Sequence, residues 1–195
     1  MAEYAFFAMM ARLRWIDRWA LMRNSQEENL AEHSLEVAML SHALCVIGNQ
    51  RFGKHLNAEK AAVMAMFHDA SEILTGDLPT PVKYYSREIR RAYQEIEVSA
   101  EGRLLALLPE EMKETYRELF SPGEDLEAEK TLVKGADKLS AYIKCIEERK
   151  AGNREFISAE KSTLEALHAL NLPEVEVFLD EFVGYYGRTL DEINP

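Results

Sequence analysis

The chain has 195 residues, 47% of them hydrophobic, and a formal net charge of −11. This length and apolar content suffice for a globular domain with a substantial core, and we expect a single domain over residues 1–195. The acidic balance disfavours a nucleic-acid polymer as partner, because binding such a polymer requires Lys and Arg to displace its counterions. The net charge does not exclude a small phosphorylated ligand held by a metal ion or by a few local cations.

Cys45 and Cys145 lie far apart, each within an apolar helical pattern. This usage is typical of reduced, buried thiols in a cytoplasmic protein. The N-terminal run AFFAMMA (5–11) follows the acidic Glu3 and is far shorter than the roughly 20 residues that a membrane span requires. We therefore expect an amphipathic helix there, a cytoplasmic protein and no membrane partner.

Helical periodicity extends over almost the whole chain, and no window shows the period-two alternation of a strand. The first expected helix has an apolar stripe from Ala5 to Ile16. The second begins at Asn29, with Glu32 at the capping-box position, and is expected to end at Gly48 and Asn49.

The same signals predict six further helices. Their expected ranges are 57–76, 86–109, 110–120, 126–150, 159–170 and 174–186. The sequence therefore predicts an all-α, multi-helix domain with short connections.

Three ionisable residues interrupt the expected apolar helix MAMFHDASEILTG: His68, Asp69 and Glu72. At about 100° per residue, their side chains share one helical face. His33, in the first turn of the second helix, and Asp137, in the middle of LVKGADKLSAYIKC, are similar exceptions on apolar faces. Aspartate is a poor residue for a helix interior because its side chain competes for backbone hydrogen bonds.

Each of these residues alone has a structural explanation: a lone histidine is usually a satisfied core residue, and a helical aspartate can pair with a lysine. Burying several carboxylates together without compensation is very costly, however, and a divalent cation would compensate them. Two imidazole nitrogens and two carboxylate oxygens suit Mn, Co, Fe, Zn or Ni and leave coordination positions for water and substrate. We expect one such ion, because His42, His55 and His168 fall outside this pattern.

The order His33, His68-Asp69, Asp137, together with the sequence around each of them, resembles the 5′-deoxynucleotidase branch of the HD-domain phosphohydrolases. The matching blocks are IDRWALMRN (16–24), ENLAEHSLEVAML (28–40), FHDASEILTGDLPTPVKY (67–84) and LVKGADKLSAYIKC (132–145). The resemblance extends over essentially the whole chain but is loose after about residue 150. It implies an all-α, metal-dependent enzyme, usually homodimeric, that removes phosphate from deoxyribonucleoside 5′-monophosphates.

The resemblance also implies roles for individual residues. The implied metal ligands are His33, His68, Asp69 and Asp137. The implied catalytic residues are Glu72, which orients or deprotonates the attacking water, Arg18 and Asp77. The implied substrate-binding residues are Arg18, Trp19, Asp69, Asp77, Leu78, Pro79, Thr80 and Asp137.

Several of these residues have a second interpretation. Arg18 offers a planar fork of donors that matches two phosphate oxygens, and Lys83 is a weaker local candidate, more typical of solvated surface. Trp19 either packs against the sugar and leaves no room at C2′ or is a core aromatic residue. Asp77 either contacts a sugar hydroxyl or the leaving oxygen, or forms an Asx turn before the prolines.

Two other functions stay open. A dNTP triphosphohydrolase or a signalling-nucleotide phosphodiesterase of the same superfamily should require more clustered cations than Arg18, Arg23 and Lys83. A helical binding module without turnover would have no use for Glu72 as a water-activating group. Apolar faces left over on the N-terminal and final helices permit a homodimer.

Overall fold

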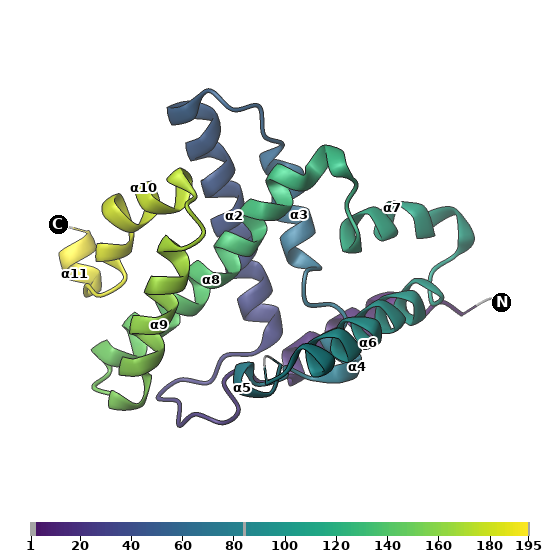
Figure 1. The fold of residues 1–195 in the computed structure, drawn as a ribbon, viewed down its shortest axis with the longest axis horizontal. Helices are drawn as coiled ribbons and strands as arrows, with labels where there is room; N and C mark the ends of the chain where they lie inside the picture. The colour runs from purple at the N-terminus through teal and green to yellow at the C-terminus, as the bar shows by residue number, and fades with distance from the viewer. Residues whose placement is uncertain (1–2, 84, 195) are drawn as a thin grey trace.

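Helices make up almost all of the regular structure in the computed structural model, which describes residues 3–83 and 85–194 (Figure 1). Two long helices, α2 (Leu30–Phe52) and α8 (Glu127–Lys150), cross at the centre of the molecule, and α3 (Ala58–Met66) packs against both. No β-strand occurs among the described residues, where the single β feature is an isolated bridge. The predicted all-α fold is confirmed.

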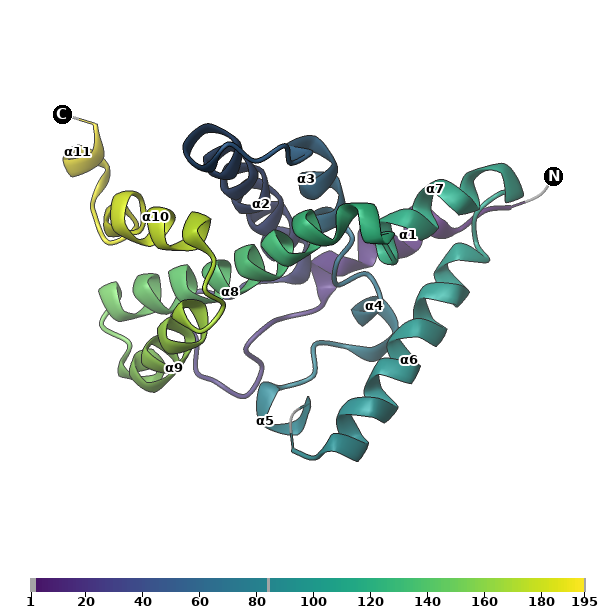
Figure 2. The same cartoon turned by 45° about the horizontal axis from the view of Figure 1, so that its top comes forward.

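The other elements surround this centre, with α9 to α11 on one side of it and α6 and α7 on the other (Figure 1). Figure 2 shows α4 next to α6, and the two helices are in contact. With η marking a 3-10 helix, these elements are α1 (Phe6–Met10), η1 (Ala11–Trp15), α4 (Glu72–Thr75), α5 (Thr80–Lys83), α6 (Arg87–Leu105), α7 (Glu110–Phe120), η2 (Glu124–Leu126), η3 (Arg154–Phe156), α9 (Ile157–His168), α10 (Pro173–Glu181), η4 (Val183–Tyr185) and α11 (Leu190–Ile193).

Two clusters of buried apolar side chains stabilise this arrangement. The larger cluster lies among α2, α3, α8 and α10 and includes Leu44 and Leu139, both fully buried. The smaller cluster joins α1 to α6 through Phe6 and Leu104, also fully buried. Phe67 packs against both clusters. Burial of each such side chain contributes about 1.5–3 kcal/mol, so the apolar stripes of the sequence account for the packing of the helices.

The start of α2 is as predicted, but its end is not. The side chain of Asn29 accepts from the backbone of Glu32, and the Glu32 carboxylate accepts from the backbone of Asn29, so the predicted capping box is confirmed. The predicted end at Gly48 and Asn49 is wrong, because the helix continues to Phe52. Gly53, with φ of 64°, supplies the left-handed C-cap instead.

Gly48 is required for packing rather than for ending the helix. A Cβ atom at this position would lie 2.7 Å from Leu56 Cδ1 and 2.9 Å from Glu174 Oε1, so only glycine fits without a shift of these side chains. By length and composition alone α2 could cross a membrane, but 56% of its most apolar stretch is buried inside the molecule. Such burial is typical of a core helix.

The single helix predicted over 57–76 is divided in two, and this prediction is wrong. α3 ends before Phe67, whose φ of −116° and ψ of 2° leave helical geometry, and α4 begins only after a turn at 67–71. The break allows α3 to pack into the larger cluster while Phe67 reaches the smaller one. His68 and Asp69 therefore lie in a turn between two helices.

The other predicted helices are present with differences at their ends, whereas the short helices α5 and α11 were not predicted. The helix expected over 5–16 is α1 continued by the tighter η1, a common way for a helix to end, and both Phe6 and Leu13 are buried. α7 has the predicted bounds and α8 begins one residue later than expected. The helix expected over 174–186 is α10 followed by η4.

The segment before α2, which we call the 16–29 loop, is fastened to α8 by a buried ion pair. The Glu148 carboxylate, 2% exposed, accepts from the backbone amides of Ser25 at 2.8 Å and Gln26 at 3.2 Å. The Lys144 ammonium, also buried, donates to Glu148 at 2.6 Å and to the Gln26 carbonyl. The position of this loop is therefore set by a charged group inside the molecule.

We predict that Glu148→Ala lowers the free energy of unfolding by about 3–5 kcal/mol, because the buried Lys144 ammonium loses its partner. Urea unfolding at pH 7 measures this change. A matched control is Glu165→Ala, which removes the exposed Lys161–Glu165 pair with the same four-residue spacing and should change stability by less than about 0.5 kcal/mol. Equal destabilisation by both substitutions would contradict the prediction.

The same pair has a defined pH dependence. Although burial raises the pKa of Glu148, hydrogen bonds from Lys144, Asn153 and two backbone amides outweigh it and lower the pKa to about 2. Because the folded pKa is below the ordinary value of 4.5, the stabilisation is fully present above about pH 4.5 and is lost as the pH falls towards 2. The stability difference between wild type and Glu148→Ala should therefore shrink between pH 5 and pH 2.

Candidate active site

Three separate segments bring the four predicted metal ligands together. His33 comes from the first turn of α2, His68 and Asp69 from the turn before α4, and Asp137 from the middle of α8. His33 Nε2 lies 3.2 Å from Asp137 Oδ1 and 3.5 Å from Asp69 Oδ2, and His68 Nε2 lies 3.0 Å from Asp69 Oδ2. Nitrogen and oxygen atoms of His33, His68 and Asp69 all fall within 4.8 Å of one another.

Neighbouring groups determine which nitrogen each histidine presents to this cluster. The Nδ1 atom of His68 lies 2.7 Å from the Ala65 carbonyl, which can only accept, so Nδ1 carries the proton. The Nδ1 atom of His33 lies 3.1 Å from the Ser140 hydroxyl, which itself donates to Glu36 Oε2 at 2.5 Å, so Nδ1 again carries the proton. Both Nε2 atoms face the aspartates and, among the described residues, neither has a hydrogen-bond partner.

The chemistry of this donor set fits a divalent transition metal. Two buried imidazole Nε2 atoms, each able to offer a lone pair when it carries no proton, are with two carboxylates a typical ligand set for such an ion. Partners that hold the opposite ring nitrogen, like Ala65 and Ser140 here, are usual around metal-bound histidines because they orient the ring. The side chain of Asp137 is 41% exposed, so one side of the cluster is open to a small molecule.

The ionisable groups of the cluster shift one another's pKa values. Burial raises the pKa of Asp69 and Asp137, but the two histidines outweigh this effect and both pKa values are lowered. Burial lowers the pKa of His68, but Asp69 and then Asp137 outweigh it and raise the pKa to about 9. The clustered carboxylates therefore demand positive charge, from a proton on His68 or from a cation that competes with it.

Glu72 lies beside this cluster as a buried carboxyl group without a cation of its own. Its Oε2 atom has no hydrogen-bond partner among the described residues. Burial, and then the charges of Asp69 and Asp77, raise the pKa of Glu72 to about 9, against the opposing effects of Lys83 and Arg18. A carboxyl group in such a setting can hold or accept a proton near neutral pH once positive charge is nearby.

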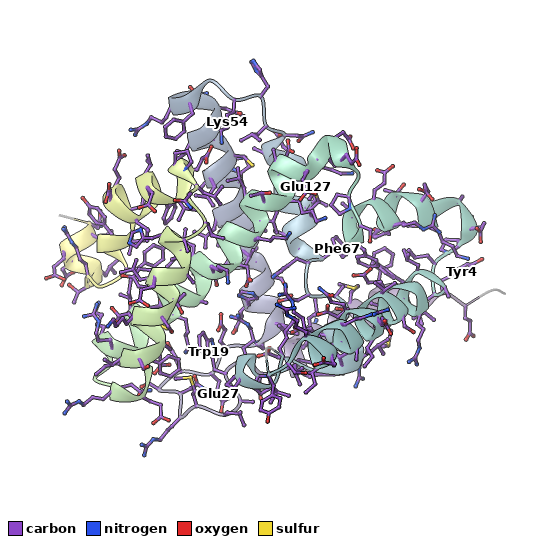
Figure 3. The ribbon with its side chains drawn as sticks, viewed as in Figure 1. Tyr4, Trp19, Glu27, Lys54, Phe67 and Glu127 are labelled. Atoms are coloured by element: carbon purple, nitrogen blue, oxygen red, sulfur yellow. The ribbon has the colours of Figure 1, made fainter. Side chains whose placement is uncertain are left out.

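The 16–29 loop presents Arg18 and Trp19 to the same region, and Figure 3 shows Trp19 on this loop. The loop closes at its neck, where the Arg18 amide donates to the Glu28 carbonyl at 2.9 Å and an isolated bridge pairs Asp17 with Asn29. Burial lowers the pKa of Arg18, but Glu28, Asp137, Asp69 and Asp77 outweigh it and raise the pKa. The guanidinium is therefore close to the carboxylates of the cluster.

The second predicted substrate loop, Asp77 to Thr80, contacts the first. Burial raises the pKa of Asp77, while Arg18 and the Trp19 backbone amide act to lower it, so this carboxylate lies near the 16–29 loop. Leu78 and Pro79 are half-buried. The side chain of Thr80 lies outside the part of the chain that the structure describes.

The sequence favoured a solvated surface position for Lys83, but its side chain is partly buried and paired. Its ammonium pairs with Glu97 at 3.0 Å and lies 4.8 Å from the centre of the Tyr93 ring. Tyr93 in turn lies 3.2 Å from Thr75, at the end of α4. Lys83 therefore attaches α5 to α6.

Three residues near the cluster were not predicted: Glu28, Glu36 and Ser140. Glu28 Oε2 accepts from both Arg18 Nη1 and Trp19 Nε1, each at 3.0 Å. Glu36 and Ser140 orient His33. The only signal in the sequence was spacing, because Glu36 and Ser140 each follow a predicted ligand by three residues, one turn of helix away.

The predictions about the other histidines and the cysteines agree with the structure. His42, His55 and His168 are exposed and lie outside the cluster, and His168 pairs with Glu176 at 2.9 Å. Cys45 and Cys145 are buried free thiols. Their burial raises the pKa of both to about 12, so they stay protonated and take no part in the site.

This fold and this arrangement of histidines and aspartates define an HD-domain phosphohydrolase. An HD-domain phosphohydrolase from Listeria innocua superimposes with a TM-score of 0.81 and 26% identity, over 93% of this chain and 87% of its own. The HD phosphohydrolase DatZ of cyanophage S-2L, bound to dA and one catalytic Zn²⁺ ion, superimposes with a TM-score of 0.62 over 91% of this chain and 95% of its own. At 19% identity this second likeness shows the fold alone.

The particular family follows from sequence similarity. The profile of the YfbR-like 5′-deoxynucleotidases matches residues 5–186. The 5′-deoxynucleotidase VV1113 of Vibrio vulnificus (strain YJ016) is 50% identical over 194 residues, which cover 100% of both chains. This chain belongs to the YfbR-like 5′-deoxynucleotidase family. The predicted resemblance is confirmed, and so is the predicted class of enzyme, a hydrolase of phosphoric monoesters.

We predict that Ser140→Ala lowers the affinity for a divalent transition-metal ion by about 10- to 100-fold, because the His33 ring loses the group that orients it. Competition with a chromophoric chelator, titrated with Co²⁺ or Zn²⁺, measures the affinity. Ser41→Ala is the matched control, since Ser41 is another buried serine of the core and its hydroxyl has no described hydrogen-bond partner. Equal affinities of the two variants would contradict the role of Ser140.

Proposed function

We propose that the clustered residues form the active site for hydrolysis of deoxyribonucleoside 5′-monophosphates to deoxyribonucleosides and phosphate, with one divalent transition-metal ion as cofactor. The proposed metal ligands are His33, His68, Asp69 and Asp137. One observation supports this most directly: two buried imidazole Nε2 atoms, which have no hydrogen-bond partner within residues 3–83 and 85–194, lie 3.0–3.5 Å from carboxylate oxygens. Co²⁺, Mn²⁺ or a similar ion suits this mixed set of ligands.

The residues around the cluster would bind and orient the phosphate. When bound, the metal ion supplies positive charge that acidifies a nearby water and neutralises phosphoryl oxygens. Arg18 contacts Glu28 through Nη1, and its other side-chain donors have no hydrogen-bond partner among the residues that the structure describes, so they could bind two phosphate oxygens. Arg18 would thereby hold the phosphorus in line with the attacking water, which is the main requirement of phosphoryl transfer.

Glu72 and Asp77 are the proposed proton carriers. Glu72 would orient the attacking water and take its proton. Burial, and then Asp69, raise the pKa of Glu72 to about 9, and the positive charge of a bound metal ion would lower it so that the carboxylate can accept a proton. Asp77 would contact a sugar hydroxyl or the leaving oxygen. Its carboxylate lies near Arg18 and the Trp19 amide, both of which act to lower its pKa, and this position supports the role over a local Asx turn.

The sugar would lie against Trp19, within a pocket completed by the loop from Asp77 to Thr80. The effect of the Trp19 amide and Arg18 on the pKa of Asp77 supports a pocket shared by the two loops. An apolar wall at C2′ would exclude the ribose hydroxyl by steric closure, and such walls typically discriminate on the order of 100-fold.

Larger anionic substrates are disfavoured by the charges of the site. Arg18 already contacts Glu28, Lys83 already pairs with Glu97, and the side chain of Arg23 is 88% exposed. A triphosphate or a signalling nucleotide with several phosphates would require more unpaired cations close to the cluster. This distribution of charge supports a monophosphate substrate.

We further propose a cytoplasmic homodimer, as the resemblance implies. Exposed apolar residues on one face of α2, Leu35, Met39 and Val46, support a covered surface there. Other exposed apolar residues lie near both ends of the chain: Tyr4, Phe7, Phe182, Tyr185 and Leu190.

We predict that metal-depleted protein releases no phosphate and that added Co²⁺ or Mn²⁺ restores release from dAMP. AMP should react on the order of 100-fold more slowly, because the wall at C2′ excludes its hydroxyl. Phosphate release from dAMP, AMP and dATP, with the metal ion varied, measures these differences. Faster release from dATP than from dAMP would favour a triphosphohydrolase instead.

We predict that Glu72→Ala lowers kcat by at least about 100-fold while retaining one metal ion per chain, because Glu72 acts on the water and not on the ion. Asp137→Ala should instead lower metal affinity first. Steady-state kinetics and the metal content after gel filtration separate the two effects. Loss of the metal ion from Glu72→Ala would show that this division of roles is wrong.

A further inference from the structure

One carboxylate oxygen accepts hydrogen bonds from the two residues of the 16–29 loop that are proposed to bind the substrate. Glu28 Oε2 accepts from Arg18 Nη1 at 3.0 Å and from Trp19 Nε1 at 3.0 Å. The side chains of Arg18 and Glu28 are each only 12% exposed, so solvent competes little for these bonds. A charged acceptor with a guanidinium and an indole as donors gives stronger hydrogen bonds than a neutral one.

The Trp19 side chain is constrained from several sides. Its indole nitrogen is held by Glu28, and its ring lies 5.3 Å from the ring of Phe156, which is fully buried. Its backbone amide is near enough to Asp77 to lower the pKa of that carboxylate. Its φ of 59° is in the left-handed region, which a bulky residue rarely adopts, so the surroundings must hold it there.

The backbone that carries Glu28 is itself fixed at both ends of the loop. At the neck, its carbonyl accepts from the Arg18 amide at 2.9 Å. At the far end, the buried Glu148 carboxylate accepts from the amides of Ser25 and Gln26, and Asn153 donates to the Arg23 carbonyl. The Glu28 side chain is therefore a rigid support, and Arg18 and Trp19 are the groups that it positions.

We propose that Glu28 is a positioning residue that determines selectivity for the deoxyribose, by fixing the Trp19 indole and the Arg18 guanidinium with a single oxygen. The inference rests on the proposed function. An apolar wall excludes a hydroxyl only if it cannot recede, and the bond from Trp19 Nε1 prevents this movement. The bond from Arg18 holds the guanidinium so that the phosphate and the sugar are positioned from the same point.

The test compares Glu28→Ala and the isosteric Glu28→Gln with wild type. We expect kcat/KM for dAMP divided by kcat/KM for AMP to fall about 10-fold in Glu28→Ala, as loss of a charge-assisted hydrogen bond implies. Glu28→Gln, which keeps one neutral acceptor, should lie between Glu28→Ala and wild type. If Glu28→Ala does not fold, the comparison of Glu28→Gln with wild type decides alone. Glu27→Gln is the matched control, since Glu27 is exposed on the same loop and should keep the wild-type ratio.

Two further readouts separate positioning from other roles. Affinity for Co²⁺ should change by less than about 3-fold, although Glu28 Oε1 lies 3.8 Å from His33 Nδ1, because Ser140 and not Glu28 is close enough to orient that ring. In a Trp15→Phe background, which leaves Trp19 as the one tryptophan, the fluorescence should shift to longer wavelength in both Glu28 variants but not in Glu27→Gln. A loss of metal affinity equal to the loss of activity would overturn the proposal.

The kinetic outcomes also distinguish this proposal from the proposed function. A selective wild type together with an equally selective Glu28→Ala would overturn the positioning role and leave the proposed function intact. A wild type that releases phosphate from neither dAMP nor AMP with any added metal ion would overturn both. A lower ratio in Glu28→Ala, with unchanged metal affinity and a shifted Trp19 emission, would support the role of Glu28.

Discussion

The central constraint of this structure is the charge of a few acids gathered inside a helical core. Asp69 lies within 3.5 Å of the Nε2 atoms of both His33 and His68, and Asp137 lies 3.2 Å from that of His33; neither nitrogen has a hydrogen-bond partner among the described residues. Clustered carboxylates of this kind require positive charge, and the raised pKa of His68, about 9, shows that the surrounding protein favours it. The proposed metal ion satisfies the same requirement. The crossing of α2 and α8, with the turn before α4 beside them, is the architecture that brings these groups together.

Hydrogen bonds from surrounding residues fix the side chains of this cluster and of the proposed substrate site. Ala65 and Ser140 hold the outer nitrogens of the histidines, and Glu28 holds Arg18 and Trp19. Further out, the buried Lys144–Glu148 pair fastens the 16–29 loop to the same helix that carries Asp137. A single helix, α8, therefore fixes both a proposed metal ligand and the loop that would bind the substrate. Sites supported in this way keep their geometry because each side chain has little freedom to move.

Much of this could be predicted because the relevant signals are local. Most helices could be predicted to within a few residues. The signals were the apolar periodicity, the Asn29–Glu32 capping box and the scarcity of proline and glycine within the helical segments. The exceptions have tertiary causes. Gly48 looked like the end of a helix but allows Glu174 to pack closely, and Phe67 ends α3 where the chain passes from one apolar cluster to the other. Local propensity does not include such contacts, because their partners are distant in sequence.

The sequence by itself determined the all-α class, the family resemblance and the four acids and imidazoles of the cluster, because buried ionisable residues are exceptional wherever they occur in an apolar pattern. Only the tertiary structure decided which nitrogen of His33 faces the aspartates, that Lys83 pairs with Glu97, and that Glu28 joins Arg18 to Trp19. A glutamate such as Glu28 and a serine such as Ser140 have no distinctive pattern in a single sequence. Their roles arise from distances between side chains, and folding alone sets those distances.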